Sequence, residues 1–397
     1  MKKRSIAQAT LVLALAASGA AHAQSTLTIF GVLDASITST TNRAQNLSPL
    51  GGSVSLSRTE LANSRSASSR LGFMGQEDLG GGMAAAFWLE APVTNDDGAT
   101  GIATFSRRST LSLVGTFGEL RLGRDYMPVF VNDVLVDPFS FNGAGAALTF
   151  IANTGSRLDR VSRANNSIAY FLPPNLGGFY GQAMYALHEG TKQTLWTTPP
   201  PPNSTRTGRH IGARFGYAKG PLDIGVAFGR STTGDDYNAG TTDEVQLASL
   251  GLTYDFNFAK FYAGVNRSKA GRDYARPPVS PLPDATLNSA LVGVTVPVGV
   301  GVIRVTYSRA VYDEHLNDNR PDPQASKIAL GYLHNLSKRT ALYATVARLR
   351  NKNGAAITIG GPAYLRSASL VPTTSAGYDV GIRDAFWSSR QAPAAPP

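Results

Sequence analysis

Side chains suited to catalysis or metal binding are scattered along this chain of 397 residues and form no recognisable catalytic or metal-binding pattern. There is no cysteine, and the five histidines show neither an HExxH motif nor a metal-like spacing. The adjacent carboxylates Glu77-Asp78 and Asp96-Asp97 would face opposite sides of a strand or be solvated in a loop, so neither makes an acid/base pair. We therefore expect no catalytic residue, no metal and no cofactor, and the chain is not predicted to be an enzyme.

A second set of polar side chains, mostly arginines, is interleaved with apolar residues. Arg70 precedes Leu71 and Phe73, and Arg304 lies between Ile303 and Val305. The formal charge is +10, but the chain lacks the basic runs that are typical of nucleic-acid-binding arms, so we expect no nucleic-acid partner. Charges placed between apolar neighbours require elements with one polar and one apolar face.

Two-residue alternation identifies those elements as β-strands. In residues 27–37, Leu27, Ile29 and Leu33 fall on one face, while Thr28 and Asp34 fall on the other. After residue 24 no apolar stretch suits a spanning helix, and without helices a chain crosses a bilayer only as a closed barrel, apolar outside and polar inside. A soluble sandwich also alternates, but the number and rhythm of these segments favour the barrel.

The segments predict an all-β fold, a 16-stranded antiparallel transmembrane β-barrel. Short connections rich in Gly, Pro and Asn alternate with long polar or irregular stretches, namely 40–63, 127–163, 190–206 and 351–372, as in outer-membrane barrels. The predicted strands start near Thr26, Arg70, Met83, Phe105, Gly118, Ala164, Phe179, Thr207, Leu222, Glu244, Lys260, Thr286, Val302, Gln324, Thr340 and Thr374.

The N-terminus has the pattern of a secretory signal. Three basic residues, 2–4, precede an apolar stretch over 9–17 and the small-residue cleavage pattern Ala21-His22-Ala23. We expect a signal peptide at 1–23, a barrel at 24–386 and a Pro/Ala-rich tail at 387–397. Removal of the signal leaves a net charge of +7, and the absence of cysteine fits export through an oxidising periplasm to the outer membrane.

Several motifs, in order along the chain, resemble the trimeric general porins of β-proteobacteria and related Gram-negative bacteria. The first two strands of that family are similar to LTIFGVLDA at 27–35 and SRLGFMGQEDLGGG at 69–82. Later matches are LGRDYMP at 122–128, NNSIAY at 165–170 and SKRT at 337–340. The resemblance covers the whole mature chain and implies a homotrimer of sixteen-stranded barrels, each narrowed by a third loop, here Met127 to Arg163.

This chain departs from the family pattern at three places. Met74 and Ala169 stand where relatives often carry a basic residue, which removes two expected positive positions from the lumen. The family ends on an aromatic residue that completes the last strand, whereas here the tail follows Phe386.

In a pore, selectivity follows from the radius and from the charges that line confined water. Inward spacing selects Arg70, Arg108 and Arg121, with Arg214, Arg304 and Arg383 elsewhere on the wall. We expect acids of the third loop to oppose these arginines across the pore, and the net charge predicts mild anion preference. The complete predicted pore-lining set is Arg70, Arg107, Arg108, Arg121, Arg124, Asp133, Asp137 and Asp159.

Two functions remain open at this point. The first is passive diffusion of small hydrophilic solutes and ions through a barrel surrounded by outer-membrane lipid and lipopolysaccharide. The alternative is a structural or adhesive barrel whose long external loops bind a partner. Conductance separates the two, since a plugged barrel passes almost no ions.

Overall fold

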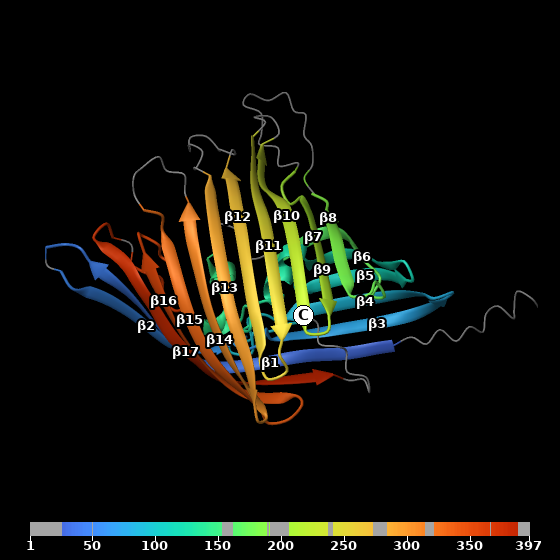
Figure 1. The fold of residues 1–397 in the computed structure, drawn as a ribbon, viewed down its shortest axis with the longest axis horizontal. Helices are drawn as coiled ribbons and strands as arrows, with labels where there is room; N and C mark the ends of the chain where they lie inside the picture. Colours follow the sequence, from blue (N-terminus) through green and yellow to red (C-terminus); the bar gives the residue numbers. More distant parts are fainter. Residues whose placement is uncertain are drawn as a thin grey trace, which may run out of the picture.

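Antiparallel strands form one closed ring in the computed structural model (Figure 1). The structure describes residues 26–49, 51–152, 162–188, 190, 206–236, 241–272, 284–313, 321–365 and 367–387. Neighbouring strands in the sequence pair with one another from β3 to β17, and β1 closes the ring by pairing with both β17 and β3. The ring of described strands therefore contains sixteen members, which confirms the predicted sixteen-stranded barrel.

Strand positions follow the alternation in the sequence. Every predicted start lies within four residues of an observed start. The strands of the ring are β1 (Thr26–Asn46), β3 (Arg70–Gly80), β4 (Met83–Pro92), β5 (Arg108–Gly115), β6 (Gly118–Tyr126), β7 (Arg163–Phe171), β8 (Phe179–Ala186), β9 (His210–Lys219), β10 (Leu222–Asp236), β11 (Thr241–Asp255), β12 (Lys260–Arg272), β13 (Ala285–Val298), β14 (Gly301–Asp313), β15 (Gln324–Asn335), β16 (Thr340–Lys352) and β17 (Leu370–Trp387).

The expected irregular stretch at 40–63 is largely a hairpin, and here the prediction was wrong. β1 continues to Asn46, and β2 (Ser53–Asn63) pairs back along its second half. Ladder hydrogen bonds satisfy the backbone of these polar residues, so serine and threonine outside the membrane can extend a strand as well as form a loop. β2 is an addition to β1 and does not enlarge the ring.

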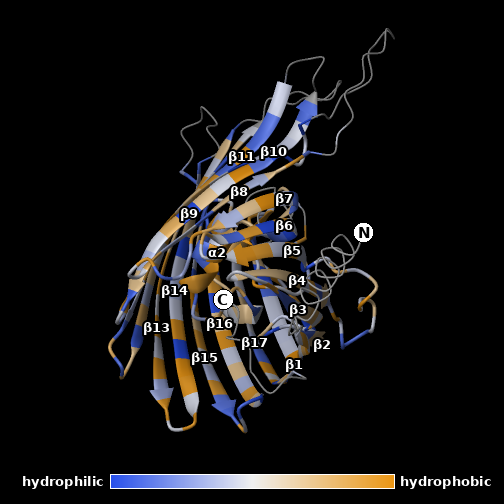
Figure 2. Ribbon diagram, turned by 90° about the vertical axis from the view of Figure 1, so that its right-hand side faces the viewer, coloured by the Kyte–Doolittle hydropathy of each residue, from blue (hydrophilic) through white to orange (hydrophobic). Residues whose placement is uncertain are grey.

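Hydrophobic and hydrophilic residues alternate along many strands of the wall (Figure 2), and the two faces differ as this alternation predicts. Large apolar side chains such as Leu33, Val265 and Val346 are exposed on the outer face, where they would meet lipid. Their neighbours in sequence, such as Asp34 and Asn266, are buried on the inner face. Among the described residues, the helices are all too short or too polar to cross a membrane.

The last strand runs one residue beyond its predicted end. Trp387 pairs with Phe30 of β1, so the first residue of the expected tail belongs to the wall. The expected signal peptide, 1–23, and residues 388–397 of the expected tail lie outside the described residues.

Candidate functional site: the narrowed lumen

The described part of the segment between β6 and β7, residues 127–152 and 162, lies inside the ring of strands (Figure 2). It contains α2 (Pro128–Leu135), a 3-10 turn at Gly143–Gly145 and α3 (Leu148–Ile151). α2 packs against β8 to β11, whereas α3 packs against β13 to β15 and the 3-10 turn against β15 to β17. We call residues 127–152 the constriction loop; their packing confirms that the third loop folds into the pore.

A row of glycines on the inner wall leaves space for this loop. Gly216, Gly225, Gly251 and Gly264 are paired side by side across β9 to β12. A Cβ atom added to Gly251 or Gly264 would lie 2.6 or 2.8 Å from the side chain of Val136. Because real Cβ atoms do not approach that closely, a side chain at either position would force Val136 to shift, and glycine allows the loop to dock at this distance.

Polar anchors hold the docked loop to the wall. The Asn132 amide donates to the Gly225 carbonyl at 3.2 Å and to the Ser249 hydroxyl at 3.0 Å. Lys327 of β15, itself buried, donates to the carbonyl of Ala146. These bonds satisfy polar groups that loop docking removes from water.

The predicted field between the loop acids and the arginines stays a prediction, but the described acids of the loop are occupied by contacts of their own. The Asp137 carboxylate accepts backbone N–H groups of Phe139, Phe141 and Ala147, each at 3.0 Å, and so organises the loop itself. Asp133 is buried and accepts a 2.7 Å bond from the Asn266 amide on β12. Burial raises the pKa of Asp133 to about 7, so near neutral pH its negative charge is only partly present. Asp159 lies outside the described residues.

The arginines predicted on strands β3, β5 and β6 do come together on the opposite wall. Arg107 donates to Glu90 at 2.6 Å, and Arg70 lies 3.6 Å from the same carboxylate. Arg121 forms bonds of 2.8 and 2.9 Å with Glu119. These contacts orient the guanidinium groups and cancel part of their charge.

Asp125 links two further members of this cluster. Its carboxylate lies 2.5 Å from Arg121 Nη1 and 3.8 Å from Arg108 Nε. Arg163, which the sequence did not suggest, donates to the Tyr126 hydroxyl at 2.7 Å. The whole cluster has five arginines and three carboxylates, and so keeps an excess of two positive charges: Arg70, Arg107, Arg108, Arg121 and Arg163 with Glu90, Glu119 and Asp125.

Aromatic rings support three of these arginines. Arg108 lies 4.5 Å above Trp88, and Arg121 lies 4.0 Å above Phe171. Arg163 lies 4.3 Å above Tyr126. Cation–π contact limits the rotamers of each guanidinium while leaving its charge in place.

Arg304 and Arg383 extend the positive wall beyond this cluster. Arg383 interacts electrostatically with Asp34 of β1 and with Arg70, and Arg304 interacts with Arg383 and with Asp137 of the constriction loop. In the described part of the chain, neither has a carboxylate within ion-pair distance. Arg214 instead contacts the constriction loop, donating to Asn132 Oδ1 at 3.2 Å.

Arg124 does not belong to the lumen set. It pairs with Ser109, on the same face of β5 as the exposed Leu111, and it donates to the Ser106 carbonyl at 2.5 Å. Arg121 and Asp125 both face the lumen, so two-residue alternation along β6 places Arg124 on the outer face. The register shift between Gly123 and Asp125 adds a residue on β7 and leaves the facing of β6 unchanged.

Sequence reasoning missed the carboxylates that pair with the arginines. One signal was available, because Glu119 and Arg121 are two residues apart in a strand and therefore share a face. Glu90 and Arg108 are neighbours only across the β4–β5 ladder, which sequence spacing does not reveal. Arg163 was treated as the last residue of the loop, although it begins β7.

Proteins similar to this chain are outer-membrane porins. The family model described as Gram-negative porin matches residues 9–354. Outer membrane porin protein 32 of Delftia acidovorans is 38% identical over 390 residues, covering 97% of this chain and 100% of the relative. An outer membrane porin protein of Bordetella pertussis is 27% identical over 376 residues, covering 88% of this chain and 95% of the relative.

Solved structures agree with this similarity. An anion-selective porin from Comamonas acidovorans superposes with a TM-score of 0.72 at 35% identity, covering 91% of this chain and 100% of that structure. A trimeric form of OmpT from Vibrio cholerae shares the fold, with a TM-score of 0.60 at 13% identity and coverage of 91% and 99%.

Proposed function

This chain belongs to the Gram-negative porin family, and we propose that its lumen is a passive diffusion channel that prefers small anions. The observation that carries the preference is the pair Arg304 and Arg383, which extends the arginine cluster without a carboxylate at ion-pair distance in the described chain. Their positive potential acts on water confined between the wall and the constriction loop, where screening is weaker than in bulk.

The state of the loop acids supports the same preference. Asp137 is occupied by three backbone donors, and Asp133 is buried against Asn266. Both carboxylates are buried, so neither presents an exposed negative charge to a passing cation. The similar structure from Comamonas acidovorans is that of an anion-selective porin, which is consistent with this proposal.

Arg70, Arg107, Arg108 and Arg121 are proposed to line the anion path together with Arg304 and Arg383. Their paired carboxylates hold the guanidinium groups in place and leave an excess of positive charge. A guanidinium fork binds anions briefly through N–H donors, and several such sites in a row allow an ion to pass from one to the next. We propose that the channel does no chemistry and needs no cofactor or metal.

The reversal potential of the purified protein across a KCl gradient in a planar bilayer tests this proposal. Discrete conductance steps with a potential of the sign expected for chloride are the predicted result. Steps with cation selectivity would refute the anion preference while keeping the channel. A folded, heat-modifiable barrel without conductance would refute the channel and favour the adhesive alternative.

Assembly and processing are part of the proposal. We propose that three copies associate, that 1–23 is removed as a signal peptide, and that the barrel lies among outer-membrane lipid and lipopolysaccharide. Crosslinking of the protein in native membranes and N-terminal sequencing of the mature chain check the first two statements. A monomeric crosslinking pattern, or a mature chain that begins at Met1, would contradict them.

A further inference from the structure

Four aromatic rings form a continuous row that begins at the arginine cluster and follows the constriction loop. Tyr126, the last residue of β6, stacks on Phe130 of α2, with ring centroids 5.0 Å apart and an interplanar angle of 9°. Phe130 lies 5.9 Å from Phe141 and 6.0 Å from Phe150 of α3. Phe141 and Phe150 stack on each other at 4.8 Å and 8°. We call these four residues the aromatic row.

Part of the aromatic row meets the water of the lumen. Phe141 is buried, whereas Tyr126, Phe130 and Phe150 are only half-buried. Because the constriction loop lies inside the ring of strands, the exposed parts of these side chains face the lumen and not lipid. Burial of an aromatic ring removes a large apolar surface from water and is favourable. A row that stays partly uncovered in a channel therefore offers apolar surface to a passing solute.

An unusual backbone conformation holds one ring of the row. Phe141 has a φ of 59°, in the left-handed region that bulky side chains rarely adopt. Its backbone N–H donates to the Asp137 carboxylate at 3.0 Å, and this bond stabilises the conformation. Strained residues of this kind persist where the surrounding structure fixes them, and they are common where proteins hold ligands. The stack of Phe141 on Phe150 is therefore built into the loop.

A guanidinium group lies at the other end of the aromatic row. Arg163 is 4.3 Å above the Tyr126 ring, and the Tyr126 hydroxyl accepts bonds from Arg163 at 2.7 Å and from Arg107 at 3.1 Å. In the described part of the chain, Arg163 has no carboxylate within ion-pair distance. Tyr126 contacts both Arg163 and Phe130, so one aromatic ring separates a positive charge from the apolar part of the row.

We infer that the aromatic row binds arylalkanoates, anions in which a short chain joins an aromatic ring to a carboxylate. The carboxylate pairs with Arg163, whose N–H donors match it in geometry and charge. The ring stacks on the uncovered parts of Phe130 and Phe150. Because Tyr126 lies between the charge and these rings, a carboxylate attached directly to the ring fits less well. The inference rests on the proposed anion channel and names a class of solute that the channel retains.

Block of the chloride current by small solutes tests the inference on the wild-type protein. Single channels in KCl are titrated with 3-phenylpropionate, benzoate, propionate and 3-phenylpropan-1-ol. The half-blocking concentration of 3-phenylpropionate is expected to be at least about tenfold below that of propionate, because propionate has no ring to bury. Benzoate, which lacks the linker, and the neutral alcohol should also block more weakly than 3-phenylpropionate.

Two variants remove the two parts of the site separately. F130L/F150L keeps apolar side chains but loses two rings, and it should raise the half-blocking concentration of 3-phenylpropionate about tenfold. R163Q loses the positive charge and should also raise it about tenfold, since hydrogen bonds to charged groups are the stronger ones. Block by propionate should weaken in R163Q and change little in F130L/F150L, because propionate uses the charge alone.

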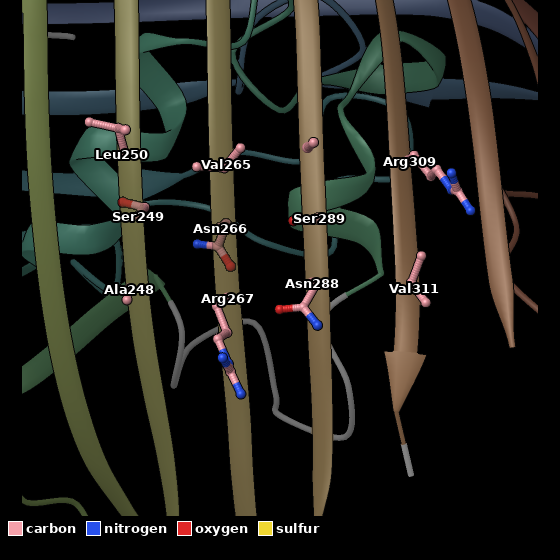
Figure 3. A pocket seen from close by; sticks show the side chains of 11 residues that line it. Ala248, Ser249, Leu250, Val265, Asn266, Arg267, Asn288, Ser289, Arg309 and Val311 are labelled. Carbon is pink, nitrogen blue, oxygen red and sulfur yellow. The ribbon is translucent and has the colours of Figure 1, made fainter. Parts of the chain in front are cut away.

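The matched controls change the same residue types at other places. Phe139 belongs to the same loop but is buried against Gly331 of β15, outside the aromatic row, so F139L is the control for the rings. Arg267 lies on β12 next to Asn266, which bonds Asp133 of the loop (Figure 3). Neighbours in a strand face opposite sides, so R267Q removes a charge from the outer face. Both controls should be blocked at wild-type concentrations.

Equal block of the wild type by 3-phenylpropionate and propionate would overturn the inference without any variant. Wild-type block of F130L/F150L or of R163Q would also overturn it. A loss of block in F139L as large as in F130L/F150L would do the same, because docking of the whole loop would then be responsible. The reversal potential in KCl alone is recorded on the same channels. Anion-selective channels that fail these tests refute the aromatic site alone, whereas silent or cation-selective channels refute the channel proposal as well.

Discussion

Lumen arginines differ in how far their charge reaches into the pore. Arg107 and Arg121 are held by close carboxylates, whereas Arg304 and Arg383 have none at ion-pair distance in the described chain. A bound carboxylate turns a charge into a dipole whose field falls off faster with distance. The residues with the strongest effect on passing ions are therefore expected to be those with the fewest contacts.

The double variant R304Q/R383Q should lower the ratio of anion to cation permeability. One unit charge at about 6 Å in water contributes roughly 0.7 kcal/mol, which is about threefold for each arginine removed. Reversal potentials measure the change, and R124Q is the control because Arg124 lies on the outer face. An unchanged ratio in R304Q/R383Q would refute the role given to these two residues.

Asp133 predicts a pH dependence of loop docking. Its folded-state pKa of about 7 lies above the unfolded value of 3.8, so the native protein holds an extra proton between these values. Docking is therefore expected to be most favourable below about pH 4, to weaken as the pH rises toward 7, and to level off above it. The total effect is at most on the order of a few kcal/mol.

Conductance noise of single channels between pH 5 and pH 8 measures this effect, since a loosely docked loop fluctuates. Noise should rise with pH in the wild type and stay flat in D133N, whose amide has no charge to bury. A D133N channel with the same pH dependence as the wild type would show that another group is responsible.

Among the secondary-structure elements, the constriction loop depends on the wall strands for its position. Val136 docks on Gly251 and Gly264, and a Cβ atom at Gly264 would lie 2.8 Å from Val136 Cγ2. The same added Cβ atom would lie 3.6 and 3.7 Å from two side-chain atoms of Leu291, which are ordinary contact distances. The close approach of Val136 to β11 and β12 therefore depends on glycine at both positions.

G264A should displace the loop and lower the thermal stability of the barrel, at an overpacking cost of about 1–3 kcal/mol. Adding V136A removes the clashing methyl groups and should restore the wild-type conductance, which gives a double-mutant cycle. G271A, on the same strand with no contact closer than 3.9 Å, is the control. If V136A did not restore the conductance of G264A, Val136 would not be the residue that docks against Gly264.

For the barrel as a whole, closure depends on the pairing of the first and last strands. β1 and β17 pair from Phe30–Trp387 to Asn46–Leu370, and Asp34 is bonded by the Tyr343 hydroxyl at 2.5 Å inside this seam. An open barrel would leave a row of unpaired backbone groups in lipid, which is costly. The ladder between these two strands is therefore the contact on which the closed form depends.

A chain that ends at Trp387 is expected to form the same heat-modifiable barrel as the full-length protein, because it keeps every β1–β17 pair. A chain that ends at Gly377 loses the pairs from Tyr378–Ser39 to Trp387–Phe30 and should not close. Migration on SDS gels with and without heating measures both. Loss of folding in the first truncation would give residues 388–397 a role in assembly.

Local patterning in the chain was enough to specify the barrel. Alternation within each strand, turn residues at one rim and the lack of any spanning helix leave one way to satisfy the backbone in lipid, so strand number and order followed. The same patterning placed Arg70, Arg108 and Arg121 on the inner face, because strand parity is a local property.

Which of these arginines are paired with carboxylates, in contrast, depends on tertiary packing. Whether an arginine is paired depends on partners from other strands, as with Glu90 of β4, which contacts both Arg70 and Arg107. Asp133 and Asp137 have the same sequence character as exposed acids, yet both are buried by the folding of their own loop onto the wall. Register, bulges and loop docking are long-range outcomes of packing, and spacing along the chain does not encode them directly.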